Sequence, residues 1–87
     1  MADTLESFAL GSVVHYVLPA GPTQGEHRPA IVVRVWDAQA GLVDLQVFLD
    51  GSNDGRPYTQ GTEWAVSVPY SEQKEGRTWH FVEAEEA

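Results

Sequence analysis

The sequence predicts an all-β fold, a small five-stranded SH3-like barrel that fills a single domain over residues 1–87. The chain has 87 residues, which is room for one domain. Short runs rich in β-branched and aromatic residues recur along it, and clusters of proline, glycine and polar residues separate them. No helical pattern exceeds a turn or two, so an OB-like barrel, which has a helical segment between strands, is the second choice.

Residues 1–18 are expected to contain one helical turn and one half-buried strand. Asp3 and Glu6 have the spacing of a helix-capping signal, which predicts a short N-terminal helical turn that ends near Leu10. Residues 12–18 form the first predicted strand, and its more apolar face is expected to point inward. The inward residues are Val14, Tyr16 and Leu18.

Residues 19–29 contain three prolines and two glycines and are predicted to form a loop. Residues 30–36 follow as the central strand, expected to be buried on both faces because its residues are almost all apolar. Arg34 interrupts this run on the face that it would share with Val32 and Trp36.

The second half of the chain predicts three further strands. Residues 37–41 form a hairpin connection, in which Gly41 suits a positive φ. Strands are expected over residues 42–49, 63–68 and 78–82, with long loops between them. In the strand over residues 42–49, the apolar face is formed by Val43, Leu45, Val47 and Leu49, and the more polar face contains Asp44 and Gln46. In the strand over residues 63–68, one face is shared by Trp64, Val66 and Val68. Residues 83–87 form an acidic C-terminal tail.

Composition limits the possible partners and compartment. The chain has no cysteine and a net charge of −8, from 13 acidic and 5 basic residues. Binding to a nucleic-acid polymer is therefore not expected, because such proteins neutralise phosphates with many Lys and Arg side chains. No apolar run reaches the ~20 residues that span a bilayer, and the N-terminus lacks the basic start of a signal peptide. We expect a cytoplasmic protein that forms a homo-oligomer to compensate for its small core.

No motif for catalysis, cofactors or metals is present in the sequence. The serines have no nucleophile-elbow motif around them, and His15, His27 and His80 are expected to be ordinary strand or loop residues. No pair of histidines has zinc-ligand spacing, so no metal site is predicted. Residues 50–55 begin like a calcium loop, but Gly61 stands where that loop needs a bidentate glutamate. We therefore expect a protein that is not an enzyme and uses no cofactor.

Arginines near aromatic residues indicate a binding site for a small anionic ligand. Arg34, Arg56 and Arg77 each lie two residues before an aromatic residue, and such pairs can stack a base and bind a phosphate. Tyr16, Phe48 and most tryptophans are expected in the core. The predicted ligand-binding residues are Trp79, His80, Arg77, Tyr58, Arg56, Tyr70 and Arg28. Pairing of these arginines with acids and rings of the same chain is the competing interpretation.

Four segments, taken in order, resemble small proteins of tailed phages and prophages. The segments are residues 28–36 (RPAIVVRVW), 47–51 (VFLDG), 67–70 (SVPY) and 78–81 (TWHF), and the resemblance covers residues 12–81. The last segment departs twice from the phage pattern GTWHW, because Arg77 replaces its glycine and Phe81 its second tryptophan. The resemblance implies a phage origin, with the protein located in the host cytoplasm.

Three functions fit these observations. The first is a phage accessory protein that binds and sequesters a small nucleotide-like host defence signal, with the aromatic residues stacking on the base and the arginines meeting phosphate. The second is a structural component of the virion head or tail. The third is an acidic inhibitor of a host protein, which requires the acidic residues to gather on one face.

Overall fold

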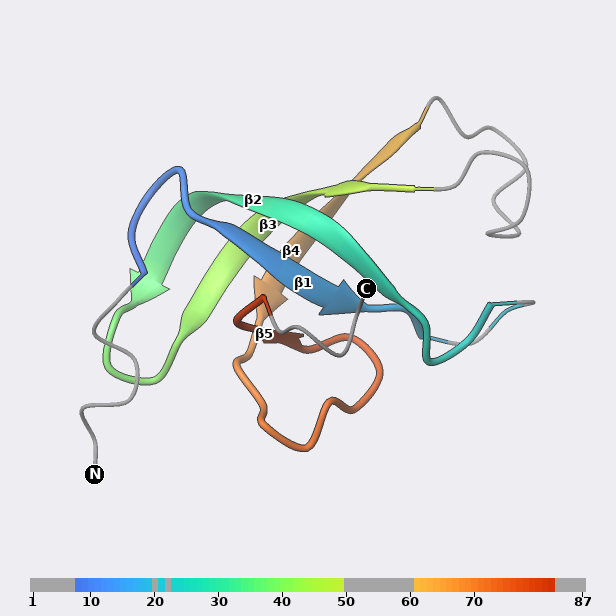
Figure 1. The fold of residues 1–87 in the computed structure, drawn as a ribbon. Coiled ribbons are helices and arrows are strands. Elements are labelled where there is room, and N and C mark those ends of the chain that lie inside the picture. Colours follow the sequence, from blue (N-terminus) through green and yellow to red (C-terminus); the bar gives the residue numbers. More distant parts are fainter. Residues whose placement is uncertain (1–7, 20, 22, 50–60, 83–87) are drawn as a thin grey trace.

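The computed structural model describes residues 8–19, 21, 23–49 and 61–82, and this part of the chain is all-β (Figure 1). Its five strands are β1 (Val13–Val17), β2 (His27–Asp37), β3 (Leu42–Phe48), β4 (Thr62–Val68) and β5 (Trp79–His80). They form an antiparallel sheet with the order β4-β3-β2-β1-β5. The prediction of a five-stranded all-β fold is confirmed, and the SH3-like barrel within that class stays a prediction. None of the described residues lies in a helix that could cross a membrane.

The two edges of the sheet are tied together where the chain leaves β4. Tyr70 and Trp79 form a parallel bridge beyond the named strands. The Trp79 amide donates to the Pro69 carbonyl at 3.1 Å, and the Ser71 amide donates to the Trp79 carbonyl at 3.0 Å. The segment after β4 therefore lies along β5, whose other side pairs with β1 (Figure 1). This contact curls the sheet and encloses its apolar face.

The hairpin between β2 and β3 forms as predicted. Gly41 has a φ of 77°, which a residue without a Cβ adopts at little cost, and its amide donates to the Asp37 carbonyl at 2.9 Å. The Asp37 carboxylate also accepts hydrogen bonds from the amides of Gln39 and Ala40. The side chain of Asp37 thus satisfies backbone donors that the turn would otherwise leave to water.

The core lies on the concave side of the sheet, and both predicted inward faces are confirmed. Along β1 and just after it, the inward residues have at most 3% of their surface exposed, and along β3 they have none. The described core residues are Phe8, Val14, Tyr16, Leu18, Ala30, Val32, Val43, Leu45, Val47, Ala65, Val68 and Trp79. Alternation of side chains between the two faces of a strand explains why these positions were predictable.

Several predicted boundaries differ from the structure. β2 begins at His27, so the predicted loop over residues 19–29 is three residues too long. Pro29 fits inside β2 because it precedes Ala30, the first residue of β2 that pairs with β3, and it therefore lies where β2 has a single neighbour. The last strand is shorter than the predicted residues 78–82. The acidic tail, and all of the predicted N-terminal turn before Phe8, lie outside the described residues.

The expectation that β2 is buried on both faces is wrong for its second half. The register of β2 on β3 shifts between Val32 and Arg34, and again between Val35 and Asp37. These β-bulges each insert one extra residue, Val33 and Trp36, and change which side chains point outward. Val32 is buried, whereas Val33 and Trp36 have 43% and 52% of their surface exposed.

Asp44 of β3 was expected on the wetter face, but only 4% of its surface is exposed. Its Oδ1 accepts a hydrogen bond from the Trp36 indole nitrogen and another from the Ser67 amide, each at 2.8 Å. Ser67 has a positive φ of 54° and lies where the register of β4 on β3 shifts. One carboxylate therefore joins irregular positions on both neighbouring strands, which compensates for its burial.

Candidate functional site

The structure places Trp79, the central residue of the predicted ligand site, in the core. None of its surface is exposed, and its indole nitrogen donates to the Gly41 carbonyl at 2.7 Å. The rings of Phe8, Tyr70 and Phe81 surround it, with centroids 4.9–5.2 Å away. Trp79 is thus a packing residue that no ligand can reach without opening the core, contrary to the stacking role expected from the sequence.

The other described residues of the predicted site do not form one platform. His80 has 1% of its surface exposed, and its ring lies on the opposite face of β5 from Trp79. Arg77 is exposed, with a φ of 69°. Tyr70 is half-buried, and its hydroxyl donates to the Glu72 carboxylate at 3.2 Å.

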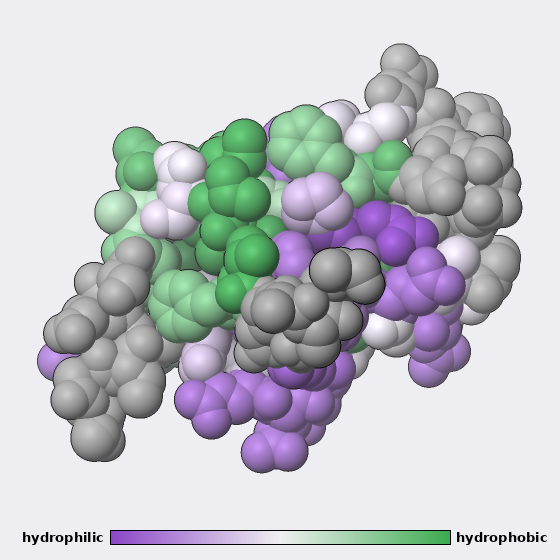
Figure 2. All heavy atoms as spheres, in the orientation of Figure 1, coloured by the Kyte–Doolittle hydropathy of each residue, from purple (hydrophilic) through white to green (hydrophobic). Residues whose placement is uncertain are grey.

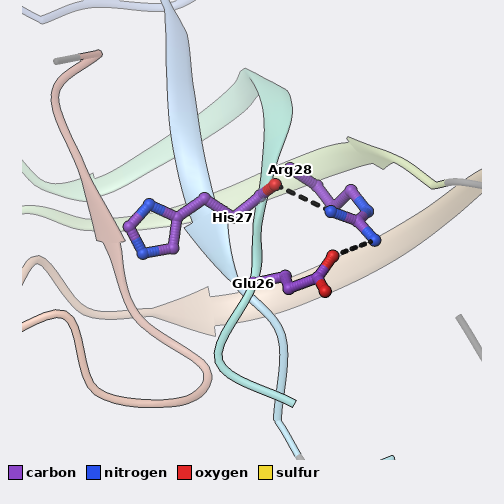
Figure 3. Close-up of polar contacts among 3 residues, drawn as sticks. All are labelled: Glu26, His27 and Arg28. Atoms are coloured by element: carbon purple, nitrogen blue, oxygen red, sulfur yellow. Dashed lines mark hydrogen bonds and ion pairs between the residues drawn. The ribbon is translucent and has the colours of Figure 1, made fainter. Parts of the chain in front are cut away.

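The side chain of Arg28 interacts with its neighbours in the sequence. Its guanidinium donates to the His27 carbonyl and forms an ion pair with Glu26, both at 3.0 Å (Figure 3). This is the intramolecular pairing that was the competing interpretation of the arginines. Arg56 and Tyr58, the remaining two predicted residues, lie outside the described residues.

The most exposed large aromatic residues lie instead on the convex side of β2, β3 and β4, which we call the outer face. Pairing of Ile31 with Gln46, and of Gln46 with Trp64, places these three side chains in one row across the strands. The alternation along β3 and β4 adds neighbouring positions to this side. The outer face comprises Ile31, Val33, Arg34, Trp36, Gln46, Phe48, Trp64 and Val66.

The aromatic residues of the outer face are exposed to solvent. Trp64 has 65% of its surface exposed, Trp36 has 52%, and Phe48 has 41%. The expectation that Phe48 and most tryptophans belong to the core is therefore wrong for all three. The Arg34 guanidinium lies 4.0 Å from the centre of the Trp36 ring, which is a cation–π contact. Tryptophan and arginine are the residue types that contribute most often to protein-binding surfaces.

Hydrophobic and hydrophilic residues are segregated over the molecule (Figure 2). In that view, apolar side chains gather over the start of β1 and the adjoining part of β2, the strands that carry the exposed Val13 and Val33. Polar side chains gather below them, over the loop that leads into β5. Val13 pairs with Ile31, so the apolar surface continues from the outer face onto β1.

A second cluster combines the only three histidines of the chain, His15, His27 and His80. One ring nitrogen from each can be chosen so that all three nitrogens lie within 4.8 Å of one another. The ring centroids are 4.5 Å apart for His27 and His80, 5.7 Å for His15 and His80, and 6.2 Å for His15 and His27. Figure 3 shows that the His27 ring points away from the Glu26–Arg28 ion pair.

Local motif spacing could not reveal this cluster, because its members come from three different strands and β5 is far from β1 and β2 in the sequence. The predicted absence of a metal site considered only histidines close together in the chain. Strand alternation gave a partial signal, because His15 belongs to a predicted strand on the face opposite the expected core and His80 to the last predicted strand. His27 lies in the predicted loop over residues 19–29, so the sequence did not connect it with the other two.

The comparisons with known proteins found no relatives. No protein-family model matches the sequence, and no curated protein and no solved structure matches the chain. The function therefore has to be inferred from the outer face and the histidine cluster.

Proposed function

We propose that this protein is a non-catalytic binding domain that docks onto a protein partner through its outer face. The observation that carries the proposal is the exposure of Trp36 and Trp64, at 52% and 65%, on one side of the sheet. The small core of this chain has a third tryptophan in it, so the fold can bury such a ring where stability requires it. Two rings left on one face are available for contact with another molecule.

The composition of the outer face fits a protein interface. Interface centres are rich in aromatic residues and arginine and poor in lysine. The outer face has Trp36, Phe48, Trp64 and Arg34, whereas the single lysine of the chain, Lys74, lies in the loop between β4 and β5. A partner that covers these rings would remove a large apolar area from water at little cost in side-chain entropy.

Charge favours a different protein over a second copy as the occupant. The net charge is −8, and the exposed Asp37 follows Trp36 of the outer face directly at the end of β2. Two identical copies would bring like charges together around this face, whereas a partner with basic residues around an apolar centre would be attracted. We therefore infer such a partner, and the homo-oligomer expected from the sequence becomes an outcome of the test.

If the protein is of phage origin, as the resemblance implies, two classes of protein partner fit the proposed docking. The partner is either another virion protein, which makes the chain a head or tail component, or a host protein that the chain inhibits. Sequestration of a nucleotide-like signal is less favoured by the positions of Trp79 and His80, which are both buried. Tyr70, Arg77 and Arg28 are the described residues that a nucleotide could still contact.

Site-specific photo-cross-linking in the cells that make the protein tests the proposal. A photoreactive residue would replace Trp64 on the outer face or, as a matched control, the exposed Gln73 in the polar loop before β5. Cross-linking from position 64 to one protein, absent from position 73, is the expected result. The identified protein is then purified, and Trp64→Gln should weaken its binding by roughly 10-fold or more, as expected for an interface tryptophan, whereas Gln73→Ala should not.

Two results would contradict the proposal. Cross-linking of position 64 only to another copy of the chain, with a dimer seen by sedimentation, would assign the outer face to self-association. Stabilisation by an adenosine-based or cyclic nucleotide that is lost in Arg77→Ala and Arg28→Ala, without a protein partner, would favour nucleotide sequestration instead.

A further inference from the structure

We propose that His15, His27 and His80 bind a divalent transition-metal ion such as Zn²⁺. No local sequence motif predicts this site. The site is separate from the outer-face rings and does not depend on the partner proposed above. It joins three adjacent strands, because β1 lies between β2 and β5 in the sheet.

Strand register brings the three histidines to one side of the sheet. His15 is directly opposite His80 in the pairing of β1 with β5. His27 is opposite Val17, and Val17 lies on the same face of β1 as His15 because a single residue separates them. The cluster is therefore produced by the backbone pairing of three strands and not by the conformation of a loop.

The distances are close to those that a metal site needs. Imidazole nitrogens bind Zn²⁺ at about 2.0–2.1 Å in a tetrahedron, which places any two of them roughly 3.3 Å apart. The nitrogens of the three histidines lie within 4.8 Å of one another, so closure requires a movement of about 1 Å or less by each ring. His15 and His27 are half-buried, so their side chains can rotate; if the buried His80 stays in place, each of the two moves by up to about 1.5 Å.

The donor set selects the class of ion. Imidazole suits Zn²⁺, Cu²⁺, Ni²⁺ and Co²⁺, whereas Mg²⁺ and Ca²⁺ prefer oxygen ligands. Among the described residues the cluster consists of these three histidines, so the fourth position would be filled by water or by a small exogenous ligand. The net charge of −8 also raises the local concentration of cations around the chain.

Bound metal would have a structural consequence for β5. This strand is only two residues long, yet it carries Trp79 into the core. An ion held by β1, β2 and β5 would cross-link the short edge strand to the centre of the sheet. Metal would then raise the melting temperature, and the shift would increase with the logarithm of the free metal concentration above the dissociation constant, because an ion that binds only the folded chain shifts the folding equilibrium by mass action.

The experiment is a titration of the full chain, prepared without a histidine tag, with Co²⁺ and then Zn²⁺. Co²⁺ should bind at one ion per chain with the visible absorption of tetrahedral nitrogen coordination, and Zn²⁺ should displace it. His15→Gln and His27→Gln should each weaken Co²⁺ binding by at least about 100-fold, since loss of an outer-shell partner alone costs 10–100-fold. Glu26→Gln is the matched control, because it removes a charge beside His27 and leaves all three imidazoles in place.

A readout in the unmodified protein keeps the proposal falsifiable if a variant fails to fold. One equivalent of Zn²⁺ should shift the ring-nitrogen NMR signals of all three histidines together. The proposal is overturned if Zn²⁺ leaves those signals unchanged, if bound Co²⁺ has the weak spectrum of octahedral oxygen coordination, or if folded His15→Gln and His27→Gln retain the wild-type affinity.

Discussion

Replacing Asp44 with alanine should destabilise the fold more than replacement of any other acidic side chain in the described sheet. Its Oδ1 accepts hydrogen bonds of 2.8 Å from Trp36 on β2 and from Ser67 on β4. Both partners lie where the pairing with β3 is irregular, so the carboxylate holds three strands in register. Without this carboxylate, the amide of Ser67, a residue with a positive φ, has lost its hydrogen-bond acceptor.

The magnitude follows from the burial and from the number of hydrogen bonds. A hydrogen bond to a charged group contributes about 1.5–3 kcal/mol to stability. The Trp36 indole is 52% exposed, so water can replace its acceptor, and the lower end of that range applies to this bond. We expect Asp44→Ala to cost about 2–4 kcal/mol in the free energy of unfolding. Asp44→Asn retains an acceptor oxygen but loses the charge, and should cost about half as much.

Urea unfolding, followed by circular dichroism, measures this cost. Asp37→Ala is the matched control, because Asp37 also accepts two hydrogen bonds and carries the same charge, but in an exposed turn. It should cost no more than about 1 kcal/mol, as for a solvent-exposed capping side chain. A loss in Asp44→Ala that equals the loss in Asp37→Ala would refute the argument that burial makes this carboxylate important. A double-mutant cycle with Trp36→Phe isolates the contribution of the indole.

Three further substitutions test other parts of the account by thermal or urea unfolding. Trp79→Phe keeps an aromatic ring in the core but removes the donor to the Gly41 carbonyl, and should cost about 1–3 kcal/mol; no loss would contradict its packing role. Arg77→Gly should raise stability by roughly 0.5–1 kcal/mol because glycine tolerates the φ of 69°, and a loss would instead assign a role to the arginine side chain. Trp64→Gln should change stability by less than about 0.5 kcal/mol, since its ring is largely exposed; a large loss would make it part of the core.

The regular parts of the fold were predictable from the sequence. Alternation of apolar and polar residues identified the inward face of β1, with Val14 and Tyr16, and that of β3, with Leu45 and Val47. The glycine at position 41, together with Asp37, identified the hairpin. These features are determined by residues that are close together in the sequence, and a periodic pattern of apolar residues is visible at that range.

The bulges of the sheet were not predictable, and the error about Trp36 follows from them. A bulge changes the alternation after Val32, and hydrophobicity alone does not mark where that change occurs. Trp36 was therefore expected in the core, although it lies outside and caps the Asp44 carboxylate. Trp79 shows the opposite error, because its polar, arginine-containing surroundings in sequence resemble those of a ligand-binding ring.

The candidate sites depend on contacts between distant segments. The histidine cluster requires the register of β1 on both β2 and β5, and the outer face requires the register of β2, β3 and β4. The spacing of residues along the sequence predicts neither register. The sequence therefore predicts a binding protein, but it does not predict the position of either proposed site.

Acrylamide quenching of tryptophan fluorescence tests most directly whether the outer face is open for a partner. The quencher is uncharged, so the net charge of −8 does not exclude it from the surface. In the isolated chain, Trp36 and Trp64 should be quenched at every protein concentration, and a Trp36→Phe/Trp64→Phe variant should retain a single, protected Trp79 signal. Strong quenching of that remaining signal, or protection of Trp36 and Trp64 that increases with protein concentration, would contradict an open outer face on a folded, separate chain.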